Sequence, residues 1–327
     1  MQKIRIGIVG YGNLGRGIEV GLRDDMELVA IFTRRPANRL GREATDNKVK
    51  IVPIDEIDAY IDKIDVLLLC GGSKTDLPQQ GPGLAKKFNT VDAYDTHAKM
   101  PEYWTSMNES SLAGSKTSIV ATGWDPGLFS LSRVLFDTIL PQATTYTFWG
   151  RGLSQGHSEA VRSIPGVKYA AQYTIPSEEM LAQVRAAQIP DYDSHSAHER
   201  EVYVVTETGA DQAKIEETII TMPDYFAGYT TRVYFISEEE FLAHHTSKPH
   251  GGSVIRVGET SPGTRSVTEL NLQLASNPEF TASVMLAYAR ACYRLSEEGS
   301  YGTKTVFDVP LSYLSERSSE ELIKEYL

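Results

Sequence analysis

The first half of the chain alternates between short apolar runs and longer stretches whose apolar positions recur at helical spacing. Runs rich in β-branched residues or leucine occupy positions 4–9, 28–32, 66–70 and 118–121. Such near-continuous apolar runs are typical of strands that are buried on both faces of a parallel sheet. Since strands that alternate with helices are joined by right-handed crossovers, this half predicts an α/β domain with a parallel sheet.

The pattern changes at about Trp124. One helix is expected over 128–140, after which strand-like alternation predicts strands at 144–149, 169–175, 202–206, 231–236, 254–257 and 267–274. A long helix is then expected over 278–297. Many strands with few helices between them favour an α+β domain with a largely antiparallel or mixed sheet. We therefore expect a first domain over 1–123, to which 303–327 returns, and a second domain over 124–302.

The composition restricts the class of ligand. The chain has 327 residues, which suits two domains, and its formal net charge of −11 disfavours nucleic acid as a partner. No apolar run approaches the ~18 residues of a membrane helix, and the N-terminus lacks a signal-peptide pattern. The two cysteines, Cys70 and Cys292, form neither a disulfide framework nor a metal cluster. A cytoplasmic protein with a small-molecule ligand, and without a metal, is the simplest interpretation.

A glycine-rich turn follows the first predicted strand and precedes the first helix. Its residues Gly10-Tyr11-Gly12-Asn13-Leu14-Gly15 match the pattern G-x-G-x-x-G in the required context. The first glycine allows a tight turn, the second allows pyrophosphate to approach the backbone, and the third allows the helix to pack on the strand. Free N–H groups at the helix N-terminus then bind the phosphate charge. The motif predicts a Rossmann dinucleotide-binding domain, although a plain glycine turn has the same letters.

The end of the second strand distinguishes NAD from NADP. NAD-dependent enzymes usually carry Asp or Glu there, which binds the ribose 2′-hydroxyl. This chain instead has Thr33, Arg34 and Arg35. A hydroxyl and two guanidinium groups suit a 2′-phosphate, because arginine binds phosphate in bidentate fashion. We expect NADP, with an exposed basic loop as the structural alternative.

Three further segments should meet at the carboxyl edge of the sheet, where ligands bind in open α/β folds. The cofactor contacts expected there are Cys70, Gly71, Gly72, Ser73, Ala93, Tyr94, Thr122, Gly123, Trp124 and Pro126. The same topology brings Asp95 and Asp125 near the nicotinamide, where carboxylates could bind an ammonium group or transfer protons. Both also fit turn and capping positions. Cys70 is more simply a small buried residue than a nucleophile, since no basic partner is evident.

Polar residues of the second half have structural explanations of their own. Arg200 opens a strand, His250 lies in a glycine turn, and Asn277 is a good N-cap because Pro278 follows it. Gly152-Leu153-Ser154-Gln155-Gly156 matches G-x-S-x-G, but neither a strand-turn-helix context nor a triad is evident from the sequence. From the residues alone, exposed polar side chains in turns and at strand ends explain this set better than a binding site does.

Six longer segments carry a combined signature. They are Gly7 to Arg16, Gly123-Trp124-Asp125-Pro126-Gly127, Thr147-Phe148-Trp149-Gly150 with Gly152 to Ser158, Thr221 to Phe226, Pro249-His250-Gly251-Gly252 and Asn277 to Ser283. In this order, and over nearly the whole chain, they resemble the meso-diaminopimelate dehydrogenase family.

The resemblance implies an NADP-dependent oxidoreductase of lysine biosynthesis. The reaction is reversible oxidative deamination at the D-centre of meso-2,6-diaminopimelate, which gives L-2-amino-6-oxopimelate and ammonia. The resemblance also implies a homodimer. At the reacting centre it implies Asp95 and Asp125 at the ammonium group, with Trp124 and Trp149 lining the pocket. Around the rest of the substrate it implies Gln155, Gly156, Glu159, Thr174, Arg200, His250 and Asn277, with Arg200 binding the distant carboxylate.

The sequence leaves three other functions open. Glu159 stands where the family has Asp, and Lys74 stands where a small residue is more usual, so the chain could be a broad-range D-amino acid dehydrogenase. A different two-domain NADP-dependent dehydrogenase, or a non-catalytic NADP-binding sensor, also fits the nucleotide motif. If the chain has the activity that the resemblance implies, Asp95, or Asp125 acting through water, accepts the proton of the substrate amine.

Overall fold

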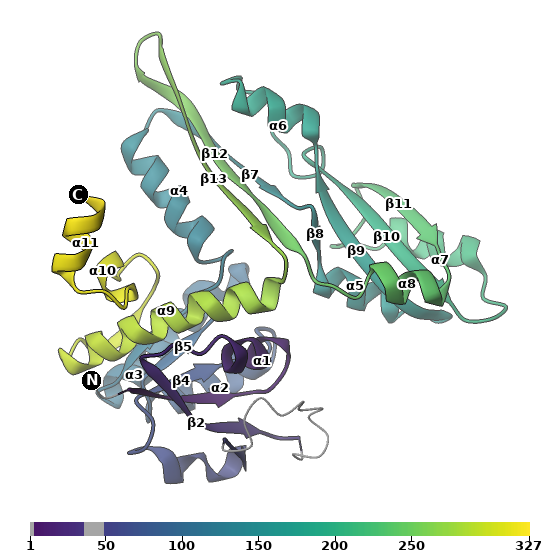
Figure 1. Cartoon of the computed structure of the whole chain (residues 1–327). Coiled ribbons are helices and arrows are strands. Elements are labelled where there is room, and N and C mark those ends of the chain that lie inside the picture. Colours follow the sequence, from purple (N-terminus) through teal and green to yellow (C-terminus); the bar gives the residue numbers. More distant parts are fainter. Residues whose placement is uncertain (1–2, 36–48) are drawn as a thin grey trace. The chain divides into compact units, whose positions relative to one another are not determined.

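The computed structural model describes residues 3–35 and 49–327, and the chain divides into two compact units (Figure 1). Unit 1 comprises Met1–Leu131 and Pro278–Leu327, and unit 2 comprises Ser132–Asn277. These limits differ from the expected domain boundaries after residues 123 and 302. The difference arises because the helix that starts at Asn277 is buried in the core of unit 1. Which unit carries which function stays a prediction.

Unit 1 contains a seven-stranded parallel sheet, which confirms the predicted α/β class. In spatial order the strands are β14 (Gly302–Lys304), β6 (Thr117–Ile119), β5 (Thr90–Asp92), β4 (Val66–Leu69), β1 (Ile4–Val9), β2 (Met26–Thr33) and β3 (Lys50–Pro53). The order changes direction at β1, so the loops after β1 and β4 lie on either side of the position where ligands bind in such sheets.

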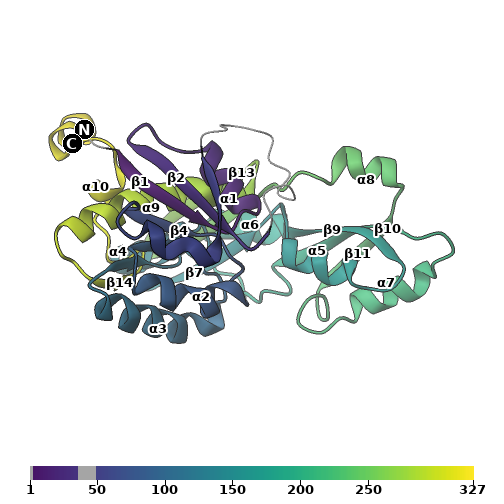
Figure 2. The same ribbon diagram turned by 90° about the horizontal axis from the view of Figure 1, so that it is seen from below.

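Helices cover both faces of this sheet. They are α1 (Asn13–Val20), α2 (Asp76–Ala85), α3 (Met100–Ala113) and α9 (Asn277–Glu297). The unit also contains α10 (Leu311–Leu314), α11 (Ser319–Tyr326), which has no buried residue, and the 3-10 turns η2 (Ile54–Tyr60) and η3 (His97–Lys99). Alternate residues of β4 show the two faces, because Val66 and Leu68 join the core with α1 and α9, whereas Leu67 and Leu69 join the core with α2 and α3. Figure 2 shows α2 and α3 side by side.

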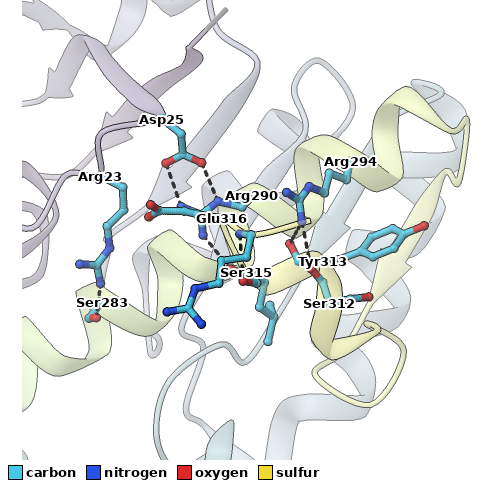
Figure 3. A network of polar contacts seen from close by, with 11 residues as sticks. Arg23, Asp25, Ser283, Arg290, Arg294, Ser312, Tyr313, Ser315 and Glu316 are labelled. Atoms are coloured by element: carbon cyan, nitrogen blue, oxygen red, sulfur yellow. Dashed lines mark hydrogen bonds and ion pairs between the residues drawn. The ribbon is translucent and has the colours of Figure 1, made fainter. Parts of the chain in front are cut away.

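A buried arginine joins the C-terminal segment to the rest of unit 1 (Figure 3). Arg290 of α9 is only 4% exposed, and its guanidinium donates two hydrogen bonds to Asp25, at 2.6 and 2.8 Å. It also donates to Glu316 at 2.8 Å and to the carbonyl oxygen of Leu314 at 2.7 Å. The loop before β2, the helix α9 and the segment after α10 are therefore held together by one cation.

Unit 2 contains two sheets, which confirms the predicted mixed architecture. The three-stranded sheet is antiparallel, in the order β13 (Thr264–Leu274), β12 (His250–Ser261) and β7 (Ala143–Trp149). The four-stranded sheet has the order β11 (Thr230–Phe235), β10 (His198–Thr206), β9 (Val167–Pro176) and β8 (Gly152–Leu153), and only the β10–β11 pair is parallel. The helices are α4 (Leu128–Ile139), which begins in unit 1, α5 (Gln155–Arg162), α6 (Glu178–Arg185), α7 (Gln212–Ile220) and α8 (Glu238–His244).

The four-stranded sheet has two different faces. Val202 and Val204 of β10 pack with residues of α5 and α7, whereas Val205 packs with Phe241 of α8 on the other face. His198 and Arg200 continue the same face as Val202 and Val204, because side chains alternate along a strand. The apolar core under α5 and α7 therefore passes into a row of polar side chains at the start of β10.

Each strand predicted from the sequence has a counterpart, and the helix α9 begins one residue before its predicted start. The analysis of the sequence did not identify β3 or β14, which are short edge strands of four and three residues without a clear apolar alternation. Within the described residues, no helix has both the length and the apolar character that a membrane span requires.

Substitution of Arg290 tests the role of this cation in stability. Arg290→Met leaves two carboxylates without their partner in a partly buried setting, so we expect a loss of about 3 kcal/mol in the free energy of unfolding, measured with urea. Arg294→Met is the matched control, because Arg294 donates only to the carbonyl oxygens of Ser312 and Tyr313. Equal losses for the two variants would contradict the role assigned to the ion pairs.

Candidate functional site

The glycine turn after β1 has the geometry that phosphate binding needs. Gly10 has φ +91°, and a Cβ atom on Gly15 would lie 2.4 Å from the carbonyl oxygen of Gly10. Any side chain at Gly15 would therefore push α1 away from β1. The N-cap Gly12 provides no side-chain cap, and within the described residues the first N–H groups of α1 have no hydrogen-bond acceptor. An anion is the natural partner of such a helix start.

A cavity of about 270 Å³ lies against this turn. The predicted cofactor residues that line it are Gly10, Tyr11, Gly12, Thr33, Arg34, Arg35, Cys70, Gly71 and Gly72. Gln80 and Asp76 line it as well, and neither was identified from the sequence. The predicted contacts that do not line it are Asn13, Leu14, Gly15, Ser73, Ala93, Tyr94, Thr122, Gly123, Trp124 and Pro126.

The arginines after β2 are held by neighbouring groups of the same cavity. Arg34 forms an ion pair with Asp76 at 2.7 Å, and Arg35 donates to the carbonyl oxygen of Tyr11. The Thr33 hydroxyl accepts from the backbone N–H of Arg35 at 3.1 Å. Burial raises the pKa of the Cys70 thiol, so this residue is a neutral part of the wall rather than a nucleophile. The donor set fits the 2′-phosphate of a dinucleotide.

The two candidate carboxylates lie in neighbouring loops of unit 1. Asp95 follows β5 and is exposed, and its backbone N–H donates to the Ser73 hydroxyl in the loop after β4 at 3.1 Å. Asp125 follows β6 and is half-buried, next to Trp124, whose ring packs edge-on against Phe129 at 5.2 Å. The peptide bond between Asp125 and Pro126 is cis. Both carboxylates therefore stand beyond the carboxyl ends of adjacent strands.

Asp92, at the end of β5, connects these two loops. Its fully buried carboxylate accepts from the N–H of Tyr94 at 3.0 Å, the hydroxyl of Tyr103 at 2.8 Å and the N–H of Ala121 at 3.4 Å. Its carbonyl oxygen accepts from the Thr122 hydroxyl at 2.8 Å. The rings of Tyr94 and Tyr103 stack at 4.0 Å, so Tyr94 belongs to the core of unit 1. One buried carboxylate thus fixes the starts of both loops.

In unit 2, strand register forms a row from several predicted residues. Thr174 of β9 pairs with Gly152 on one side and with Arg200 on the other, so all three positions share one face of the sheet. The His250 ring lies over Gly152, because a Cβ atom there would lie 2.5 Å from the ring. The backbone N–H of Asn277 donates to the carbonyl oxygen of Lys248, which brings Asn277 near the same turn.

Arg200 is a buried cation in this row. It is 8% exposed, its Nη1 donates to the Thr174 hydroxyl at 2.6 Å, and its guanidinium lies over the Tyr229 ring at 4.0 Å. Within residues 3–35 and 49–327, Arg200 has no ion pair with a carboxylate, and its buried Nε has no hydrogen-bond partner. Burial lowers the pKa of Arg200, which records the cost of holding this charge away from water.

The remaining predicted residues surround the row or stand apart from it. The backbone N–H of Trp149 donates to Nε2 of His198 at 2.9 Å, and His198 pairs with Pro176 two positions from Thr174. Gln155 and Gly156 begin α5 and are exposed. Glu159 is also exposed, and it forms an ion pair with Arg162 of the same helix.

The G-x-S-x-G segment has the strand-turn-helix context that the sequence did not reveal, between β8 and α5. Its Ser154 is the N-cap of α5, and the Ser154 hydroxyl also contacts Nδ1 of His157 at 2.8 Å. A capping role therefore accounts for this serine without nucleophilic chemistry.

Besides Asp76 and Gln80, the analysis of the sequence missed four polar residues of the two units. Asp92 is the last residue of the three-residue strand β5, which the apolar pattern did not single out. Gln172 is completely buried beside Thr174, and within the described residues its Oε1 has no hydrogen-bond partner. In the sequence it is a single polar residue in a strand pattern, which gave no signal of a site. His198 and Tyr229 reach the row only through pairing of β9, β10 and the segment before β11, which no local pattern contains.

A parallel sheet with a dinucleotide-type glycine turn, together with a second unit that buries polar side chains, defines a two-domain dehydrogenase fold. The model of the diaminopimelic acid dehydrogenase C-terminal domain matches residues 123–276. The meso-diaminopimelate D-dehydrogenase of Ureibacillus thermosphaericus is 53% identical over 100% of both chains. The chain belongs to the meso-diaminopimelate D-dehydrogenase family, which confirms the resemblance noted from the sequence.

Two solved structures are similar over nearly the whole chain. One is a sixfold-substituted meso-diaminopimelate dehydrogenase of Clostridium tetani with DAP, at 51% identity and a TM-score of 0.92, covering 99% of this chain and 100% of that one. The other is an engineered D-amino acid dehydrogenase bound to NADP⁺, at 42% identity and a TM-score of 0.86, with 100% of both chains covered.

The pH dependence of stability tests the Asp92 cluster. Burial raises the pKa of Asp92 to about 6, although hydrogen bonds from Tyr94 and Tyr103 act in the opposite direction. The stability that this carboxyl contributes is therefore fully present below its unfolded pKa of ~3.9 and is lost as the pH rises through about 6. We expect Asp92→Asn, measured against the unsubstituted protein, to gain about 2 kcal/mol in relative stability between pH 4.5 and pH 7.5. A difference that is independent of pH in urea unfolding would contradict this assignment.

Proposed function

We propose that this protein catalyses the reversible NADP-dependent oxidative deamination of the D-centre of meso-2,6-diaminopimelate in lysine biosynthesis. The products are L-2-amino-6-oxopimelate, ammonia and NADPH. Membership of the family supports this reaction, and one observation on the chain itself carries the choice of substrate. Within the described residues the buried guanidinium of Arg200 has no carboxylate partner, so the site favours a substrate with a carboxylate far from its reacting carbon.

The nucleotide cavity supports NADP as the cofactor. The free N–H groups at the start of α1 suit the pyrophosphate, and Thr33, Arg34 and Arg35 suit the 2′-phosphate. The engineered relative that binds NADP⁺ supports the same choice. When bound, NADP⁺ accepts a hydride at its nicotinamide ring.

Asp95 and Asp125 supply the acid–base chemistry in this proposal. The substrate ammonium must lose a proton before its carbon can lose a hydride, because nitrogen needs a free electron pair to form the imine. Asp95, or Asp125 through water, accepts that proton. Water then adds to the imine carbon and ammonia leaves. The hydrogen bond from the Asp95 backbone to Ser73 and the link through Asp92 support a fixed position for both loops.

The distal residues hold the centre that does not react. Meso-diaminopimelate carries the same two groups at both ends, so orientation requires a clamp on the L-centre. Arg200 binds the L-carboxylate, with Thr174, His250 and Asn277 around it, and Gln155, Gly156 and Trp149 border the rest. Glu159 faces solvent with Arg162, so it is the weakest member of the proposed set.

The substituted positions of the Clostridium tetani protein coincide with most of the proposed distal set. Its six substituted residues are a Gln, a Thr, an Arg, a Pro, a His and an Asn. The same residue types recur in this chain with the same spacing, as Gln155, Thr174, Arg200, Pro249, His250 and Asn277. Five of these six positions belong to the set expected from the sequence, and Pro249 precedes His250.

The proposal includes a homodimer in the cytoplasm. Val134, Leu135 and Ile139 of α4 are between 48% and 56% exposed, which is unusual for three large apolar residues of one helix. A second copy of the chain would cover such a patch. Sedimentation equilibrium measures the oligomeric state directly.

A substrate panel tests the proposed reaction. We expect NADP⁺ reduction, followed at 340 nm, with meso-diaminopimelate and a kcat/KM at least about 100-fold above that for D-alanine or D-phenylalanine, because only the first substrate has a distal carboxylate. NAD⁺ should be a poor substitute because it lacks the 2′-phosphate. Comparable rates with all three amino acids would favour a broad-range D-amino acid dehydrogenase, and cofactor binding without turnover would favour a sensor.

The proton acceptor is tested by Asp95→Asn. We expect the turnover number to fall at least about 100-fold because the amide cannot accept a proton, while the Kd for NADPH, measured by fluorescence, stays within about twofold. Glu109→Gln, an exposed residue of α3, is the matched control and should keep full turnover. Unchanged turnover in the Asp95 variant would remove Asp95 from this role.

A further inference from the structure

The Arg200 guanidinium has few partners for a buried cation. One hydrogen bond joins Nη1 to the Thr174 hydroxyl at 2.6 Å, and Nε is buried without an acceptor. A guanidinium carries five N–H donors, so most of its hydrogen-bonding capacity is unused in the described residues. The guanidinium carbon also lies 4.0 Å from the centre of the Tyr229 ring, and the Tyr229 side chain favours the charged form of Arg200.

The acids nearest in sequence are directed away from Arg200. Glu199 and Glu201 are its neighbours on β10, and alternation along the strand places both on the opposite face. There Glu199 forms an ion pair with Arg232 at 2.7 Å, and Glu201 forms one with Arg151 at 2.6 Å. Neither carboxylate is therefore available to neutralise Arg200.

Tyr229 is itself held in place. Its backbone N–H donates to the carbonyl oxygen of Phe226 at 3.0 Å, and its ring packs against the His195 ring at 4.4 Å. Gly228, just before it, has φ +89°, and a Cβ atom there would lie 3.0 Å from the His195 ring. The tight turn at Gly228 thus places the face of the Tyr229 ring against the guanidinium of Arg200.

We propose that Tyr229 is a specificity-determining positioning residue, whose ring fixes the Arg200 guanidinium so that its free edge receives the distal carboxylate of the substrate. This inference rests on the proposed function. An arginine side chain has ~2 kcal/mol of rotamer entropy, and a ring over one face removes much of the freedom that carboxylate binding would otherwise have to restrict. The ring also stabilises the cation by its quadrupole without neutralising it, whereas a protein carboxylate would compete with the substrate.

The experiment compares two substrates in four variants. Tyr229→Leu removes the aromatic face and should raise KM for meso-diaminopimelate about tenfold, while KM for D-alanine, which lacks a distal carboxylate, changes less than about twofold. Tyr229→Phe keeps the ring and should restore KM for meso-diaminopimelate to within about twofold. Tyr234→Leu is the matched control, because Tyr234 stacks on Tyr203 at 5.0 Å on the opposite face of the sheet. Arg200→Met calibrates the full effect of losing the guanidinium.

The possible results separate this inference from the proposed function. If Arg200→Met raises KM selectively for meso-diaminopimelate but Tyr229→Leu does not, the positioning role of Tyr229 is overturned. An equal rise for both substrates in Tyr229→Leu, or no recovery in Tyr229→Phe, overturns it as well, because either result indicates a general loss of structure. If Arg200→Met affects both substrates equally, the distal clamp of the proposed function fails instead.

Discussion

Burial of a guanidinium that has no carboxylate partner among the described residues is the constraint on which the proposed distal site in unit 2 depends. A cation that loses water without gaining an anion destabilises the fold, and proteins keep such groups mainly where a ligand supplies the missing charge. At Arg200 the surrounding sequence maintains this state, since the acids beside it on β10 face the other side of the sheet and are paired there. A ligand carboxylate that pairs with this guanidinium would offset the desolvation cost that the protein carries without the ligand.

Unit 1 meets a complementary requirement with the opposite charge. Its candidate carboxylates, Asp95 and Asp125, are carried by loops rather than by strands, and loops alone are poor at holding a side chain in place. The buried carboxylate of Asp92 compensates, because it bonds to the start of both loops and to Tyr103 of α3.

The sequence alone was sufficient for the features that depend on local pattern. The glycine turn, the arginines after β2 and the long helix α9 are each encoded within a few neighbouring residues, and the fold class followed from them. Features that depend on pairing between distant segments could not be predicted from the sequence. The edge strand β14 has three residues and is a strand only because β6 lies beside it. Tyr229 meets Arg200 through the pairing of β10 with β11, and Asp92 was visible only as the last residue of a short strand. Family resemblance suggested the distal residues, but it could not show that Arg200 has no carboxylate partner among the described residues.

The return of the chain from unit 2 to unit 1 has a consequence for synthesis on the ribosome. Strand β14 completes the edge of the parallel sheet, and α9 supplies Met285, Tyr288 and Cys292 to its core. Because these parts follow residue 277, the sheet of the N-terminal segment lacks α9 on one face and β14 at one edge until the residues after 277 have been synthesised. Unit 2 is continuous and needs no later segment. The inserted unit 2 is therefore able to fold first, and unit 1, although it starts the chain, completes its core last.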